Sequence, residues 1–158
     1  MRNLFSILQT IILSLALLML SITPAISMSL IETKKLAEQG DIDAQLDLGS
    51  MYEKGIGVEQ DYTKAFSLYQ EISGVPQAQY RLGSMYEKGV GVEQNSLKAI
   101  YWYQEAAESG VPQAQYRLGS MYEKGDVVRK NIANAKEWFS KSCDNGVLLG
   151  CNAYRLLK

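Results

Sequence analysis

The chain has 158 residues, of which 47% are hydrophobic and 21% are charged, and its formal net charge at pH 7 is −1. A nearly neutral chain has no general attraction to nucleic acid or to anionic lipid. The sequence contains no histidine, which excludes histidine general bases, Ser-His-Asp and Cys-His catalytic groups, and zinc sites that need imidazole. The two cysteines are too few for a tetrahedral structural zinc site.

The first segment, residues 1–27, has the composition of a secretory signal peptide. Arg2 supplies a positive start, residues 4–22 are mostly apolar, and Ala25 and Ser27 place small residues at the positions that determine cleavage. We therefore expect cleavage after Ser27 and a mature protein, residues 28–158, in the periplasm or outside the cell. The alternative is an uncleaved membrane anchor, because an apolar segment of about nineteen residues is long enough to span a bilayer.

An eight-residue sequence, Leu-Gly-Ser-Met-Tyr-Glu-Lys-Gly, then occurs three times, beginning at Leu48, Leu82 and Leu118. The starts are 34 and 36 residues apart (48 to 82, then 82 to 118). A period of about 20–50 residues is typical of a solenoid built from one supersecondary unit. We predict one repeat domain, with a half-repeat cap at residues 28–40, repeats at about 42–74, 75–110 and 111–146, and a C-terminal cap at 147–158.

Each repeat is predicted to form two helices. In the first helix of the middle copy, apolar or small residues recur at helical spacing, which indicates a core-facing stripe: Ala78, Leu82, Met85 and Tyr86. Gly83 lies inside this helix at a cost of about 1 kcal/mol relative to alanine, so we expect the paired helix to approach closely there.

Turn and capping residues separate the predicted helices. Gly89 follows the first helix, where a left-handed C-cap favours glycine. Asn95 is predicted to cap the second helix, as are Asp61 and Asn131 in the flanking copies. The second helix of the first copy should be shorter by about half a turn, because two residues are missing there. Val127 replaces a turn glycine in the third copy, so we expect a different turn.

The combined pattern over residues 78–110 resembles the Sel-1-like repeat, a relative of the tetratricopeptide repeat. It reads Ala-x-x-x-Leu-Gly-x-x-Tyr-x-x-Gly-x-Gly-Val, a capping Asn, and Lys-Ala-x-x-Trp-Tyr-x-x-Ala-Ala-x-x-Gly. The resemblance extends over about residues 42–151. It implies an all-α, right-handed α–α superhelix of antiparallel helix pairs that acts as a scaffold or adaptor in protein–protein interactions. Periodicity alone predicts only a helical solenoid.

Cys143 and Cys151, eight residues apart, resemble the cysteine pairs of the secreted cysteine-rich Hcp proteins, in which such pairs bridge adjacent helices as disulfides. An even number of cysteines, an export signal and a short helix–helix connection also favour a bridge. Closing a loop of about nine residues would contribute about 2.5 kcal/mol. The alternative is a pair of free thiols packed as small hydrophobic groups.

Cysteine-rich relatives of this kind imply an alternative function, namely β-lactam binding or weak β-lactam hydrolysis. However, the sequence contains no Ser-x-x-Lys, Ser-Asp-Asn or Lys-Thr-Gly motif. The recurring Glu-Lys pairs at 53–54, 87–88 and 123–124 precede capping glycines, where a cation complements the helix dipole. We therefore expect a protein that is not an enzyme and uses no cofactor or metal.

A binding face is predicted on the side of the first helices opposite the core, which repeat solenoids turn toward their concave surface. Tyrosine and arginine often anchor interfaces, so a repeated Tyr/Arg ladder could grip an extended segment of an envelope or host protein. The alternatives are a solvated face copied by duplication and a purely structural envelope component. We expect a monomer that binds a protein or peptide, does not bind nucleic acid, and does not insert into membranes after signal cleavage. The candidate residues are Tyr80, Arg81, Ser84 and Lys88 in the middle copy, and Tyr116, Arg117, Ser120 and Lys124 in the third.

Overall fold

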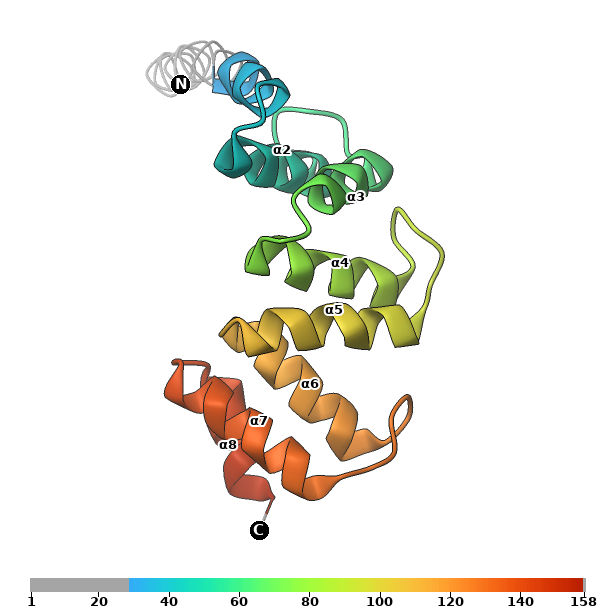
Figure 1. Ribbon diagram of the computed structural model, residues 1–158, viewed down its shortest axis with the longest axis vertical. Coiled ribbons are helices and arrows are strands. Elements are labelled where there is room, and N and C mark those ends of the chain that lie inside the picture. The colour runs from blue at the N-terminus through green and yellow to red at the C-terminus, as the bar shows by residue number, and fades with distance from the viewer. Residues whose placement is uncertain (1–28, 158) are drawn as a thin grey trace, which may run out of the picture.

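The computed structural model describes residues 29–157, so the predicted signal peptide at 1–27 lies outside the described residues. The described part is an all-α solenoid: it contains eight helical segments and no strand. Figure 1 shows these helices stacked along the long axis of the molecule. Their order is residues 29–38, α2 (Ile42–Lys54), α3 (Tyr62–Glu71), α4 (Pro76–Lys88), α5 (Ser96–Glu108), α6 (Pro112–Lys124), α7 (Ile132–Asp144) and α8 (Leu148–Leu156).

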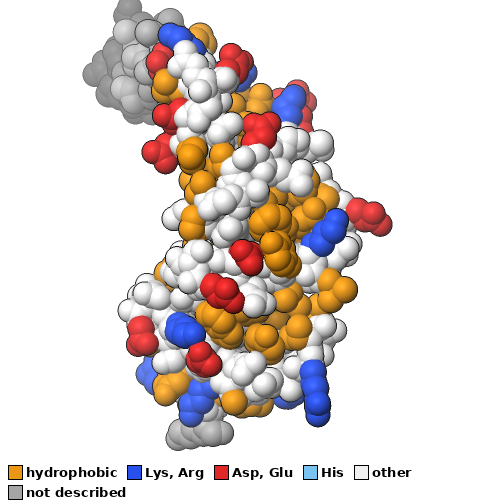
Figure 2. Space-filling model, viewed as in Figure 1, with side chains coloured by type: hydrophobic (Ala, Val, Ile, Leu, Met, Phe, Trp, Pro, Cys, Tyr) orange, Lys and Arg blue, Asp and Glu red, His pale blue; other side chains and the backbone are white. Residues whose placement is uncertain are grey.

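The core is distributed along the stack. Each first helix (α2, α4, α6) packs against the second helix of its own repeat (α3, α5, α7), which in turn contacts the next first helix. Three clusters of buried side chains follow one another, and the Phe66 and Tyr86 rings meet edge to face across a repeat junction, with centroids 5.4 Å apart. Contacts are therefore mainly between neighbours, as expected of a solenoid. Figure 2 shows hydrophobic side chains between the charged ones, most densely in the middle and lower parts of the visible face.

Close packing of the two helices explains the glycine within each first helix. A Cβ atom on Gly83 would lie 2.7 Å from the Tyr103 ring. Gly49 faces Tyr69 and Gly119 faces Phe139 in the same way, at 2.6 and 2.8 Å. The close approach predicted at Gly83 is confirmed, and the glycine permits an aromatic ring of the second helix to lie directly on the first.

The helix boundaries agree with the predicted caps. The side chains of Asp61, Asn95 and Asn131 each accept a hydrogen bond from the backbone N–H three residues later. Gly89 ends α4 in the left-handed conformation, with φ 68°. The second helix of the first repeat has 10 residues, against 13 in the other two, so the predicted shortening is confirmed.

The turn of the third repeat differs from the others. Gly57 and Gly91 adopt positive φ angles of 73° and 71°, while no non-glycine residue among those described has a positive φ. Val127, at the corresponding position, therefore gives this turn another backbone path, as predicted. The reason is steric, because a β-branched residue is strongly disfavoured in the left-handed region.

The C-terminal helix α8 lies where a further first helix would lie. The Val147 N–H donates to the Ser142 carbonyl, as the Val111 N–H does to Ala106 one repeat earlier. However, Arg155 occupies the position of Gly119. Its guanidinium donates hydrogen bonds to the Cys151 carbonyl and to Asn152 Oδ1 within α8. A second helix could not approach α8 here as α7 approaches α6.

Candidate partner-binding face

The outer stripes of the first helices form one surface, which we call the first-helix face. Its members are spaced at i, i+4, i+7 and i+11 and are all exposed or half-buried. The Arg81 guanidinium lies 3.5 Å from the Glu53 carboxylate, and that of Arg117 lies 3.9 Å from the carboxylate of Glu87. These ion pairs place successive first helices beside one another. The members are Asp43, Asp47, Ser50 and Lys54 of α2; Gln77, Arg81, Ser84 and Lys88 of α4; Gln113, Arg117, Ser120 and Lys124 of α6; and Leu149, Ala153 and Leu156 of α8.

Only some residues of the predicted Tyr/Arg ladder lie on the first-helix face. Arg81, Ser84 and Lys88, with their counterparts Arg117, Ser120 and Lys124, belong to the first-helix face. The two tyrosines do not. The rings of Tyr80 and Tyr103 have centroids 5.8 Å apart, and those of Tyr116 and Phe139 are 5.6 Å apart. Because one residue advances a helix by about 100°, Tyr80 and Tyr116 turn toward the second helix of their own repeat and only border the face.

A hydrogen-bonded network underlies the face. The Tyr103 hydroxyl donates to Glu87 Oε2 at 2.6 Å, and Glu87 also pairs with Arg117 of the next repeat. The preceding repeat has the same arrangement, in which Tyr69 donates to Glu53 at 3.0 Å. Each glutamate thus joins the second helix of its own repeat to the first helix of the next. The sequence reasoning missed this role; the only signal was that Glu, Tyr and Arg recur at equivalent positions.

Burial keeps the tyrosines of this network protonated. Desolvation is the largest cause of the raised pKa of Tyr103 and of Tyr69, and the adjacent carboxylates Glu87 and Glu53 raise each pKa further. Both hydroxyls therefore remain donors throughout the physiological range. The network ends in the third repeat, because Phe139 and Ala153 occupy the positions of Tyr103 and Arg117.

A hollow of about 200 Å³ opens between α4 and α6. Its charged lining residues are Glu87, Asp126, Arg117 and Lys124, and Ser120, Ala99 and Met121 also line it. Ser96, also on its wall, occupies the position of the larger Tyr62 in the first repeat, and this smaller side chain leaves more space. The hollow is large enough for one side chain of a bound segment.

A protein-family model matches the three complete repeats. The Sel1 repeat model matches residues 42–72, 76–111 and 112–147. The chain belongs to the Sel1 repeat family. No curated protein matches it significantly.

Several solved structures resemble this Sel1 repeat protein. One is c5321, a protective antigen of uropathogenic Escherichia coli with an SLR fold (36% identity, TM-score 0.76, 80% of this chain and 28% of that chain). Another is a Sel1 repeat protein from Oxalobacter formigenes (37% identity, TM-score 0.72, 80% and 97%). A third is Helicobacter pylori cysteine rich protein B (25% identity, TM-score 0.62, 77% and 93%). The chain thus spans about a quarter of the length of c5321.

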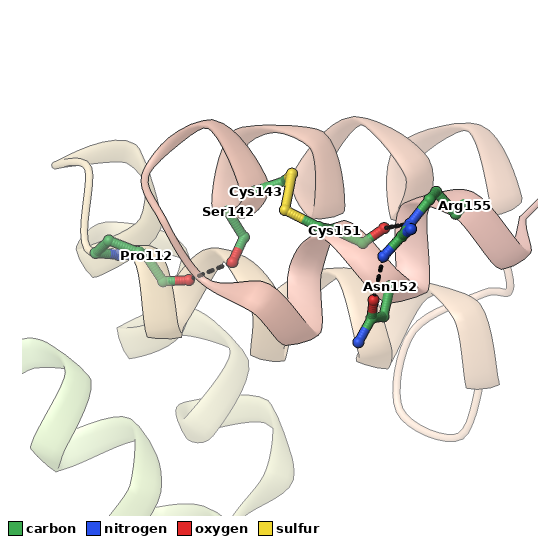
Figure 3. The surroundings of a disulfide bond; sticks show 6 residues. All are labelled: Pro112, Ser142, Cys143, Cys151, Asn152 and Arg155. Atoms are coloured by element: carbon green, nitrogen blue, oxygen red, sulfur yellow. Dashed lines mark hydrogen bonds between the residues drawn. A yellow bond between two sulfur atoms is a disulfide. The ribbon is translucent and has the colours of Figure 1, made fainter.

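The cysteines of this Sel1 repeat protein lie at a repeat junction. Cys143 and Cys151 are joined by a disulfide, with Cα atoms 4.5 Å apart, and Figure 3 shows the bridge between α7 and α8. At the same two positions one repeat earlier, Gln115 Nε2 donates to the Ala107 carbonyl at 3.1 Å. The covalent bond therefore replaces a hydrogen bond between a second helix and the first helix that follows it.

Proposed function

We propose that this Sel1 repeat protein is an exported, non-catalytic scaffold that binds an extended segment of another protein along its first-helix face. Sel1 repeats typically mediate protein–protein interactions. One observation carries the proposal. The first-helix face continues across successive repeats, and ion pairs with Glu53 and Glu87 restrain its two arginines, Arg81 and Arg117.

These arginines are both accessible and restrained. The side chains of Arg81 and Arg117 are 36% and 43% exposed while they pair with carboxylates of the preceding repeat. Binding immobilises side chains at an entropic cost, and groups that are already ordered lose less. Arginine is also enriched among the residues that dominate interface energies. A row of ordered arginines therefore supports binding more than a row of freely rotating lysines would.

Photo-crosslinking tests this proposal. A photoreactive amino acid at Ser84 or Ser120 should capture the same partner from an envelope or secreted fraction. The matched control positions are Ser67 on α3 and Gln104 on α5, which are exposed on second helices and should capture nothing specific. The double variant Arg81→Ala with Arg117→Ala should lose the crosslink. Equal capture from all four positions would contradict the proposal.

Export rests on two features of the chain. Residues 1–27 have the composition of a signal peptide, and disulfides such as Cys143–Cys151 persist mainly in oxidising compartments. Within residues 29–157, no helix is long and apolar enough to cross a membrane. Intact mass of the protein from cell fractions of its host, with and without reduction, should show a chain beginning at Met28 with two hydrogens fewer than its reduced form. A full-length chain with free thiols in the membrane fraction would refute export.

The alternative of β-lactam binding or hydrolysis makes a different prediction. It requires turnover or tight binding of a chromogenic β-lactam that a point substitution abolishes. We expect neither, because the sequence contains none of the three β-lactamase motifs, Ser-x-x-Lys, Ser-Asp-Asn and Lys-Thr-Gly. Measurable turnover that survives repurification would refute the non-catalytic part of the proposal.

A further inference from the structure

The chemistry of the first-helix face changes along the stack. On α2 the face presents the exposed carboxylates of Asp43 and Asp47, which outnumber the single exposed cation, Lys54, at the end of the helix. On α4 and α6 the position of Asp47 is taken by Arg81 and Arg117. On α8 the face presents leucines, with Leu149 59% and Leu156 83% exposed. An acidic end, a basic centre and an apolar end therefore follow one another on a single surface.

On α4 and α6, the pairing of charges leaves the members of the face basic, while the carboxylates of Glu123 and Asp126 lie beside Lys124 at its border. Glu53 and Glu87 pair with Arg81 and Arg117, so these four side chains nearly neutralise one another. The exposed lysines at the ends of α4 and α6, Lys88 and Lys124, form no ion pair among the described residues. Neither do Asp43 and Asp47 at the other end of the face.

The leucines of α8 are not positioned to receive another repeat. Arg155 occupies the glycine position that admits a second helix in the complete repeats. Leu148, 70% exposed, lies beside Leu149, so α8 presents a small apolar group next to the basic centre. An apolar partner group that covers these leucines would remove their surface from water, which is favourable. An occupant that lies along the face can cover them without passing Arg155.

We infer that the partner segment is an extended peptide with three blocks in order. An apolar block contacts α8, an acidic block faces Lys124 and Lys88, and a basic block reaches Asp47 on α2. The inference rests on the proposed function, because it assigns chemistry to the same face. Complementary charge fixes register and excludes wrong partners more than it adds affinity, so the order of the blocks carries the specificity.

Fluorescence anisotropy with labelled synthetic peptides tests this order. Peptides of about twelve residues are long enough, at about 3.3 Å per residue, to pass four helices about 10 Å apart. The first peptide has the order basic–acidic–apolar, the second has the same composition in the order acidic–basic–apolar, and the third replaces the leucines of the first by serine. We expect the first to bind at least tenfold more tightly than either of the others.

Protein variants test which side chains cause the preference between the peptides. Lys88→Glu with Lys124→Glu should abolish the preference between the first two peptides, because the centre then carries the same charge as α2. Lys35→Glu with Lys98→Glu makes the same charge change at exposed positions outside the first helices of the repeats and should leave the preference unchanged. Leu149→Ser with Leu156→Ser should reduce the affinity for the first peptide to that for the third. Because these side chains are exposed, the variants should fold, which circular dichroism checks.

The outcomes separate the inference from the proposed function. Equal affinity for the two charge orders overturns the inference, whatever the crosslinking shows. No peptide binding, together with specific capture from Ser84 and Ser120, also overturns the inference but leaves the scaffold function intact. No peptide binding and no capture overturn both. The expected order preference, abolished by the two lysine substitutions, supports both.

Discussion

The side-chain amide of Asn145 donates a hydrogen bond of 3.0 Å to Oε1 of Gln115. Because Gln115 Nε2 also donates to a backbone carbonyl, both ends of this buried amide are bonded. One repeat earlier, Gln79 Nε2 donates to the Ser73 carbonyl at 3.0 Å, but Gln79 Oε1 is buried and has no partner among the described residues. Ser109 stands at the position equivalent to Asn145, and its shorter side chain carries no amide.

The substitution Ser109→Asn should therefore stabilise the protein. A new hydrogen bond to Gln79 Oε1 should raise the free energy of unfolding by about 1 kcal/mol, since it satisfies a buried acceptor. Urea unfolding measures the change. Asn145→Ser is the reciprocal variant, and it should lower stability by about 1–3 kcal/mol. An unchanged urea midpoint for both variants would show that hydrogen bonds to the Gln79 and Gln115 amides do not contribute to stability.

The network below the first-helix face predicts opposite effects for two conservative substitutions. Tyr103→Phe removes a hydrogen bond to the charged Glu87 and should cost about 1–3 kcal/mol. Phe139→Tyr adds a hydroxyl at the equivalent position, where Glu123 can accept it, and should be neutral or stabilising by up to about 1 kcal/mol. Denaturant unfolding of both variants gives the comparison. Equal destabilisation by the two changes would argue against the network.

The same tyrosines predict a loss of stability in alkali. The pKa of Tyr69 and of Tyr103 is raised above the ordinary value of 10.0, chiefly by burial. Above pH 10 the unfolded chain therefore loses protons that the folded chain retains, and the free energy of unfolding falls as pH rises. Below pH 10 this contribution is constant. Unfolding midpoints between pH 8 and 11 should show the decline, and Tyr69→Phe with Tyr103→Phe should make it shallower. A slope that does not change in this variant would contradict the assignment.

Helix pairing predicts that Gly83→Ala destabilises although alanine favours a helix. The new Cβ would lie 2.7 Å from the Tyr103 ring, and overpacking typically costs about 1–3 kcal/mol, more than the helical gain of about 1 kcal/mol. Gly74→Ala is the matched control, because a Cβ there has no neighbour within 4 Å and the backbone needs no positive φ. Thermal unfolding should show a lower midpoint for the first variant only.

The disulfide predicts a cap that loosens on reduction. Cys143→Ala with Cys151→Ala should cost about 2.5 kcal/mol, as expected for a loop of about nine residues in the chain-entropy model. Alanine suits position 143, since Ala107 occupies the equivalent site. Hydrogen exchange should rise in α8 and remain unchanged in α4. Faster exchange throughout the chain would mean that the bridge supports the whole stack.

Much of the fold could be predicted because its determinants are local and repeat along the chain. The core stripe of α4, the N-cap residues and the glycine C-caps each depend on residues within a few positions of one another. Gly83 likewise predicted that the paired helix lies close, since a glycine within a helix needs a packing explanation. The charge order of the first-helix face is likewise contained in the sequence, once the residues of each stripe are known.

Only the tertiary structure decided which side chains meet between helices. Tyr103 and Glu87 are 16 residues apart, and Asn145 and Gln115 are 30 apart. Tyr80 was expected on the outer face, but it turns to Tyr103, because the rotation of each helix about its axis is set by packing with its neighbours. The sequence determined the repeating helices and their boundaries, since these follow from short-range periodicity and capping. The contacts between repeats follow from how the stacked helices are rotated and spaced, which no single repeat specifies alone.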